Sequence, residues 1–171
     1  MDIFETKGIS PMLISEQVEP YNDDNSIFEL KLDGIRCIAY CNSQSVDLRN
    51  KRDMKLLPRF PELNFLHTAC KEKCILDGEL NVFVNGKPDF YEVQKRTLMN
   101  DPFKIKLAVN KHPANFVAYD ILYYRDHLVT ELPLMERKEI LSDVVNENDR
   151  ISVSRYIEND GIALFDFVKE Q

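Results

Sequence analysis

Apolar and polar residues alternate with a period of two along several segments, which predicts strands. A strand over Phe28–Leu32 places Glu29 and Lys31 on one face and the apolar side chains on the other. Asp33-Gly34 then predicts a tight turn in which the glycine can adopt positive φ. The turn leads into a second strand over Ile35–Cys41, which we expect to pair with the first.

The same reasoning extends along the rest of the chain. Further strands are predicted over Ser45–Arg49, Ile75–Val84, Phe116–Tyr124 and Ile151–Tyr156. Helices are predicted where a capping residue or a proline precedes the segment, over Glu62 to about Lys73, Asp89–Thr97, Asp101 to about Asn110, Pro133–Val145, and from Asn159 to the last residue. Because strands outnumber helices and hairpin turns connect several of them, we predict an α+β fold with antiparallel-rich sheets flanked by helices.

Composition limits the class of protein. The 171 residues suffice for one domain, over residues 1–171, and 44% of them are hydrophobic. No apolar run is long enough to span a membrane, and the N-terminus lacks the pattern of a signal peptide. We therefore expect a cytoplasmic protein without a membrane partner. A net charge of −7 argues against a protein that coats nucleic acid through bulk charge.

Charge is unevenly distributed, however. Residues 29–59 hold seven basic and four acidic side chains, and Arg49, Lys51 and Arg52 are close together in the sequence. Such a local basic surface fits phosphate contacts at one face of an acidic protein. A solvated loop rich in lysine and arginine explains the composition equally well.

The four cysteines occur as two C-x-x-x-C pairs, Cys37 with Cys41 and Cys70 with Cys74. Structural zinc sites more often use C-x-x-C, and His67 is the only imidazole nearby in the sequence. We interpret the cysteines as free thiols rather than as metal ligands or disulfides. The scattered histidines suggest no chemistry.

Four polar or aromatic side chains on the predicted strands are candidates for a binding site. The amine of Lys31 can attack phosphorus, and Glu79 can accept hydrogen bonds from sugar hydroxyls or hold a divalent ion. Tyr119, predicted to share a strand face with Ile121, offers a ring for stacking a base, and Arg49 suits bidentate contact with phosphate. Considered alone, each of these four residues is also consistent with an ordinary surface or core position.

Together these motifs resemble the adenylation domain of ATP-dependent DNA ligases. The matching segments, in that family's order, are Glu29-x-Lys31-x-Asp33-Gly34-x-Arg36, Leu48-Arg49-Asn50, Asp77-Gly78-Glu79-Leu80 and Phe116–Tyr124. Lesser matches are Pro11-Met12-Leu13, Phe90 with Gln94 and Arg96, and Leu132-Pro133-Leu134 with Glu136-Arg137. The resemblance implies the ATP-grasp-like nucleotidyltransferase fold of covalent ligases.

It also implies roles for individual residues. Lys31 would be the nucleophile that forms a phosphoramidate with AMP. The ATP-binding residues would be Glu29 at adenine, Arg36 at the ribose or nick phosphate, Arg49 at the sugar or the DNA 5′-phosphate, Glu79 at the ribose and Mg²⁺, and Tyr119 stacked on adenine. Arg49, Lys51 and Arg52 would contact DNA.

The implied cofactors are ATP and Mg²⁺, and the implied partner is nicked double-stranded DNA, bound by a monomer in DNA repair, replication or recombination. An RNA ligase or a GTP-using mRNA capping enzyme shares several of these motifs. A module that binds nucleotide or DNA ends without covalent chemistry is an alternative of another class.

Members of the family continue with an E-G-x-x-x-K strand, a K-x-K strand and an oligonucleotide-binding domain. Val168–Gln171 stand where the first of these should begin. We therefore expect a C-terminally incomplete adenylation domain that needs these segments and seals nicks weakly or not at all by itself.

Overall fold

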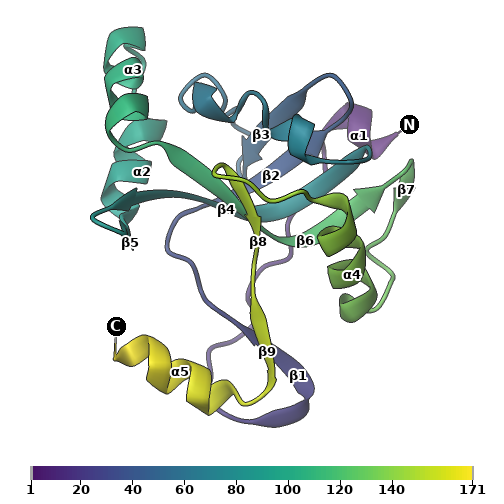
Figure 1. Ribbon diagram of the computed structural model, residues 1–171. Helices are drawn as coiled ribbons and strands as arrows, with labels where there is room; N and C mark the ends of the chain where they lie inside the picture. Colours follow the sequence, from purple (N-terminus) through teal and green to yellow (C-terminus); the bar gives the residue numbers. More distant parts are fainter. Residues whose placement is uncertain (1, 171) are drawn as a thin grey trace. The chain divides into compact units, whose positions relative to one another are not determined.

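A computed structural model describes residues 2–170 and divides them into two compact units (Figure 1). The larger unit holds residues 2–11 and 32–153, and the smaller holds residues 12–31 and 154–170. Each is described by itself.

The larger unit is built on a seven-stranded sheet whose main path runs β3-β2-β4-β6-β7, from the blue strands of Figure 1 to the green ones. The neighbours along this path are antiparallel, β5 pairs with β4, and β8 joins β6 in parallel. Its strands are β2 (Ile35–Cys41), β3 (Val46–Asn50), β4 (Cys74–Val84), β5 (Lys87–Pro88), β6 (Ala114–Tyr124), β7 (His127–Leu128) and β8 (Ile151–Val153).

The helices α2 (Phe90–Thr97), α3 (Pro102–Lys111) and α4 (Leu134–Val144) begin close to the predicted residues. A short helix, α1 (Ile3–Thr6), was not predicted. The Asp89 carboxylate caps α2 by accepting a hydrogen bond from the Glu92 N–H at 2.9 Å. Asp101 caps α3 in the same way. The predicted α+β fold with an antiparallel-rich sheet is confirmed.

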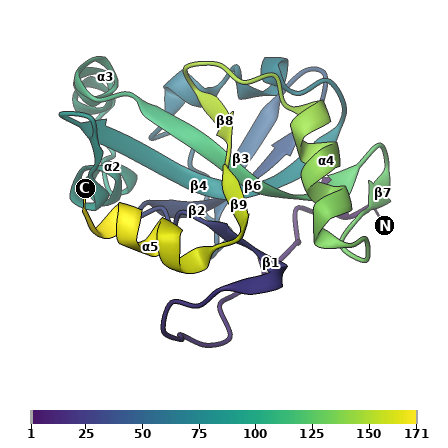
Figure 2. The same cartoon turned by 60° about the horizontal axis from the view of Figure 1, so that its bottom comes forward.

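One face of the sheet carries the main core. Alternate residues of β2, β4 and β6 point to this face and pack against α2, α4 and two 3₁₀ turns, and α4 contacts β6 (Figure 2). Fully buried members are Ala39, Leu48, Leu76, Leu80, Val93, Phe116, Ile121 and Leu141. The opposite face is apolar only in part, where Phe4 of α1 packs at ring-centroid distances of 6.0 Å from Tyr40 and 5.8 Å from Tyr123.

The smaller unit is an antiparallel pair of strands with one helix. β1 (Asp23–Glu29) pairs with β9 (Tyr156–Asn159), and α5 (Gly161–Lys169) contacts both strands. Gly161 is required here because a Cβ at this position would collide with the ring of Phe28 and the backbone carbonyl of Tyr21.

The predicted hairpin between 28–32 and 35–41 is wrong. β1 ends at Glu29 and pairs with β9, while β2 is paired on its two sides by β3 and β4. Residues 30–33 are therefore a connection rather than a strand end. Gly34 does not adopt positive φ.

The predicted helix from Glu62 to Lys73 is also wrong. The segment forms two 3₁₀ turns, Pro61–Leu63 and Leu66–Ala69. The buried residues Leu63, Leu66 and Ala69 recur every three positions, which is the repeat of a 3₁₀ helix rather than of an α-helix.

The C-terminal elements are shifted. The strand predicted over Ile151–Tyr156 is divided into β8 and β9, which belong to different units. Asp160 rather than Asn159 caps α5, and Asn159 has a φ of 68°. α5 ends at Lys169, and Gln171 lies outside the described residues. Within residues 2–170, no helix has both the length and the apolar character needed to cross a bilayer.

Candidate functional site

A polar half of the second sheet face lies beyond the area that Phe4 covers in the larger unit. Arg36 on β2 stands opposite Glu79 on β4, and Asp77 lies two residues before Glu79 on the same face. Tyr119 on β6 completes the group, with its ring 5.3 Å from the Arg36 guanidinium carbon. We call Arg36, Asp77, Glu79 and Tyr119 the polar half.

A bidentate ion pair holds the centre of the polar half. Arg36 donates from Nε to Asp77 Oδ1 at 2.9 Å and from Nη2 to Oδ2 at 2.5 Å. The Asp77 side chain is 3% exposed and that of Arg36 is 24% exposed. Burial raises the pKa of Asp77, against the opposing effect of Arg36, and the hydrogen bonds that Arg36 donates to Asp77 raise the pKa of Arg36. The pair presents a cation with a fixed orientation beside an aromatic ring.

A β-bulge places Tyr119 on this face. The register between β4 and β6 passes from Gly78–Ala118 to Asp77–Asp120 and skips Tyr119. The predicted common face for Tyr119 and Ile121 is therefore wrong, because Ile121 is buried in the main core. Burial raises the pKa of Tyr119, so its ring stays neutral at physiological pH.

Two cations of α4 fix the bulge. The buried Lys138 donates to the backbone carbonyl of Tyr119 at 2.6 Å. Arg137 donates to both carboxylate oxygens of Asp120 at 2.9 Å and to the Leu132 carbonyl at 2.6 Å. The roles of Asp77 and Lys138 were not predicted from the sequence. Asp77 within an otherwise apolar part of a strand was the available signal.

Gly34 lies against β4 at the edge of the polar half. A Cβ at this position would collide with the Leu80 carbonyl oxygen, with Asn81 Oδ1 and with Glu79 Cγ. The glycine of the Asp-Gly pair is thus required for close approach of two backbones rather than for a left-handed turn.

Glu79 is half-buried and does not belong to a group of three or more metal-ligating side chains within residues 2–170. A single carboxylate nevertheless fits Mg²⁺ that is bound together with phosphate, since such ions keep several waters and use one or two carboxylates.

Lys31 and Glu29 lie in the smaller unit, where they line a cavity of about 520 Å³ together with apolar side chains of β1 and α5. Lys31 is exposed and follows the end of β1 by two residues. The predicted nucleophile therefore opens onto a cavity large enough for a small planar ligand.

Arg49 forms part of a second cavity, of about 300 Å³, between residues 6–11 and 49–53 of the larger unit. Its guanidinium donates to Asp47 at 3.0 and 3.1 Å and to Asp53 at 2.7 Å. Burial lowers the pKa of Arg49, but the hydrogen bonds to these carboxylates outweigh it and raise the pKa overall. Lys51 and Arg52 line the same cavity, so the structure brings the three predicted DNA contacts together.

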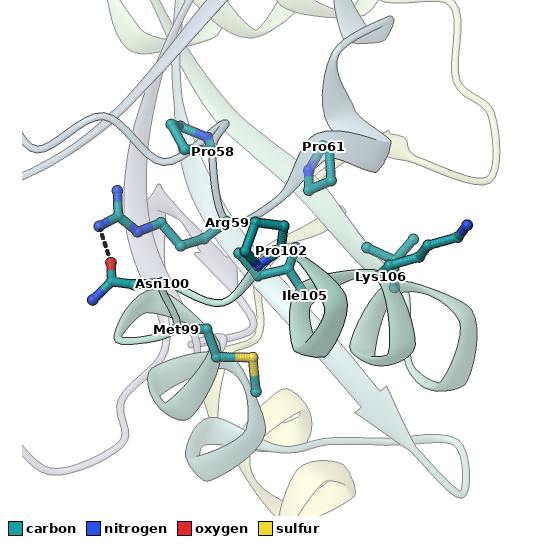
Figure 3. A pocket seen from close by; sticks show the side chains of 9 residues that line it. Pro58, Arg59, Pro61, Met99, Asn100, Pro102, Ile105 and Lys106 are labelled. Carbon is teal, nitrogen blue, oxygen red and sulfur yellow. Dashed lines mark hydrogen bonds between the residues drawn. The ribbon is translucent and has the colours of Figure 1, made fainter.

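A third cavity, of about 470 Å³, has mainly apolar walls from Pro58, Pro61, Pro102 and Ile105 (Figure 3). Its rim carries a hydrogen bond from Arg59 to Asn100, at 2.9 Å. None of the residues predicted for chemistry lines it.

The motifs belong to a known family. A family model described as "ATP dependent DNA ligase domain" matches residues 10–170. This chain belongs to the family of ATP-dependent DNA ligase domains.

Curated relatives come from several bacteria. The chain is 30% identical over 164 residues to the SPbeta prophage-derived DNA ligase-like protein LigB of Bacillus subtilis, a match that covers 95% of this chain and 57% of that protein. It is 30% identical over 138 residues to DNA ligase C of Mycobacterium tuberculosis, which covers 80% of this chain and 38% of the relative. The chain thus spans about half or less of the curated relatives that it matches.

Solved structures share the fold. A mycobacterial DNA ligase D complexed with ATP and MES matches with a TM-score of 0.73 at 20% identity, over 94% of this chain and 50% of the other. The ligase domain of LigD from M. tuberculosis matches with a TM-score of 0.65 at 21% identity, over 84% and 44%. The predicted nucleotidyltransferase fold of covalent ligases is confirmed.

Proposed function

We propose that this chain carries out the adenylation chemistry of a DNA ligase. The neutral amine of Lys31 attacks the α-phosphorus of ATP, a P–N bond forms, and the bond to pyrophosphate breaks. AMP then passes from Lys31 to the 5′-phosphate at a nick in double-stranded DNA, and the adjacent 3′-hydroxyl displaces AMP to form the phosphodiester.

The observation that carries the proposal is the convergence of the family's motifs on binding surfaces. Arg36, Asp77, Glu79 and Tyr119 come from three strands and form one polar half, although the first and the last are 83 positions apart in the sequence. A neutral ring beside an oriented guanidinium supports binding of a base next to an anionic or hydroxyl-rich group. The cavity of the smaller unit, which Lys31 and Glu29 line, is by itself large enough for a small planar ligand.

Individual roles follow from this chemistry. We propose that Tyr119 stacks on adenine, that Glu29 accepts a hydrogen bond from it, and that Arg36 contacts the ribose or phosphate. Glu79 would bind a ribose hydroxyl and supply one ligand to Mg²⁺, whose charge would stabilise the pyrophosphate leaving group.

Arg49, Lys51 and Arg52 are proposed to bind the DNA backbone. Arg49 is oriented by Asp47 and Asp53, whereas Lys51 and Arg52 are exposed and free to follow a phosphate chain. We propose nick sealing separately from adenylation, since the match covers only 57% of the relative LigB.

The test is covalent labelling. The purified chain is incubated with Mg²⁺ and ATP labelled at the α-phosphate, and the labelled residue is identified by mass spectrometry. We expect one AMP on Lys31, no label on Lys31→Arg, and a normal level on Lys104→Arg, whose lysine is exposed on α3. Label at another residue, or equal labelling of Lys31→Arg, would exclude the proposed nucleophile.

GTP offered in place of ATP separates a DNA ligase from a capping enzyme. Binding of ATP without any covalent product, while an intact ligase is labelled in parallel, would favour a non-catalytic module. Transfer of AMP to nicked DNA but not to nicked RNA then separates the two ligase classes.

Tyr119→Ala tests the stacking role. We expect ATP binding to weaken by about 1–3 kcal/mol, the usual loss for one base–aromatic stack. Tyr91→Ala is the matched control, since Tyr91 is 80% exposed on α2. Unchanged affinity in Tyr119→Ala would show that the ring only fills space beside Arg36.

A further inference from the structure

Three cysteine thiols meet at one end of the sheet in the larger unit. Cys41 is the last residue of β2, Cys74 is the first residue of β4, and the two stand directly opposite each other in the antiparallel register. Cys70 comes from the end of the second 3₁₀ turn. The three sulfur atoms all lie within 4.8 Å of one another.

The backbone around these cysteines is fixed independently of any ligand. The N–H of Cys70 donates to the His67 carbonyl at 3.0 Å. On either side of Cys70, the Lys71 N–H donates to the Val144 carbonyl at 2.9 Å and the Ala69 carbonyl accepts from the Asn146 N–H at 2.8 Å. Cys70 is thereby held between the sheet and the end of α4, so the cluster is preorganised.

The donor set suits a soft cation. Cys41 and Cys74 are buried and Cys70 is half-buried. Thiolate sulfur is a donor that selects Zn²⁺ over the hard ions Mg²⁺ and Ca²⁺.

We propose that Cys41, Cys70 and Cys74 bind one Zn²⁺ ion, with a fourth position open to solvent on the side of Cys70. Zn–S bonds of about 2.3 Å in a tetrahedral site put sulfur atoms about 3.8 Å apart. The sulfurs need to approach by no more than about 1 Å, which side-chain rotation supplies. Zn²⁺ displaces the thiol protons to solvent as it binds.

The site lies away from the polar half. Cys41 and Cys74 project into the main core, the face of the sheet opposite the polar half. A bound ion would connect the segment that carries the 3₁₀ turns to β2 and β4. C-x-x-x-C spacing is an indirect signal, because the third ligand, Cys41, is 29 residues away from Cys70.

Metal analysis of the reduced, full-length chain after incubation with Zn²⁺ and gel filtration tests the proposal. We expect one zinc per chain in the wild type and loss of stoichiometric zinc in Cys70→Ser. Cys37→Ser is the matched control, because Cys37 lies outside the cluster and its sulfur already faces the Ile38 carbonyl, which can accept from a serine hydroxyl. The control should keep one zinc.

A second measurement does not depend on how well a variant folds. Zn²⁺ should slow alkylation of the half-buried Cys70 in the wild type, and Co²⁺ in its place should give thiolate-to-metal charge-transfer absorption. Three results would each overturn the site. The wild type could hold less than one zinc per chain, or Cys70→Ser could retain as much zinc as the wild type. The third is an alkylation rate of Cys70 that is the same with and without Zn²⁺. A disulfide between any two of the three cysteines that persists under the reducing conditions of the test would overturn the site as well.

Discussion

The second face of the sheet has two halves with the same backbone and opposite chemistry. In the covered half, Ile38, Tyr40 and Tyr123 pack under Phe4 of α1. In the polar half, the same faces of β2, β4 and β6 carry Arg36, Asp77, Glu79 and Tyr119. Where an apolar residue is supplied from outside the sheet, the face becomes core. Where none is supplied, alternation leaves a row of polar side chains available for a ligand.

Removing the Phe4 side chain, which covers one half of the face, should give the largest loss of stability. Phe4 is 1% exposed, and Phe4→Ala should lower the free energy of unfolding by about 3 kcal/mol, near the lower end for buried phenylalanine because the short α1 can detach instead of leaving a cavity. Urea unfolding measures the loss. Phe65→Ala, at a residue that is 75% exposed, should change stability by less than about 0.5 kcal/mol.

The covered half is expected to support the fold and not the chemistry. At a temperature where Phe4→Ala remains folded, its affinity for ATP should equal that of the wild type. A large loss of ATP binding in this variant would remove the distinction between the two halves.

Breaking the ion pair of the polar half should lower the free energy of unfolding by less than Phe4→Ala does. Asp77→Ala leaves Arg36 without its bidentate partner, and we expect a loss of about 2 kcal/mol, less than for a fully buried pair because Arg36 is 24% exposed. In Arg36→Met combined with Asp77→Leu, both charges are absent, and most of the stability should return. A double variant whose loss equals the sum of the losses measured for Arg36→Met and Asp77→Leu alone would show that the residues do not act as a pair.

Gly34→Ala tests the close approach between backbones. The new Cβ meets the Leu80 carbonyl, which is fixed in β4, and we expect a loss of about 1–2 kcal/mol, typical of overpacking. Gly8→Ala is the control because a Cβ there meets only Thr6 Oγ1 at 3.9 Å. Thermal unfolding of both variants measures the difference. Equal melting temperatures would show that Gly34 does not lie as close to the Leu80 carbonyl as described.

The difference between the halves also explains which features the sequence could predict. The caps Asp89 and Asp101 act on the next few residues and were located correctly, because the signal and its effect are both local. The bulge at Tyr119 depends on the register between β4 and β6, which no period within β6 reveals.

Contacts between residues that are far apart in the sequence were the part of the site that could not be predicted. Asp77 meets Arg36 across 41 positions, and the motif around Arg36 does not indicate that its guanidinium is bound by another side chain. Cys41 lies beside Cys70 and Cys74 only because β2 and β4 are neighbours in the sheet. The C-x-x-x-C spacing in the sequence does not indicate this cluster, and it led to the prediction of separate free thiols. The types of residue in the site were predictable, and their partners were not.

Acid should affect the two halves in opposite directions, with the smallest effect of the series. The pKa of Asp2 is lowered, first because its carboxylate accepts from the Phe4 N–H and then through Lys73, so its stabilising effect exists above the ordinary value of 3.8 and is lost as the pH falls through the folded-state pKa. Burial raises the pKa of Asp77, so its contribution is greatest at low pH and is lost as the pH rises through its folded-state pKa.

Acidification from pH 6 to pH 3 should therefore protonate Asp77 before Asp2, because the pKa of Asp77 is raised and that of Asp2 is lowered from the same ordinary value. In a titration followed by NMR, the ring signals of Tyr119 should shift at a higher pH than those of Phe4 and Tyr123. Asp2→Asn keeps an N-cap acceptor without a titrating group and should abolish the later shift of Phe4 and Tyr123. Signals of Phe4 and Tyr123 that shift before those of Tyr119 would mean that the two carboxylates titrate in the opposite order.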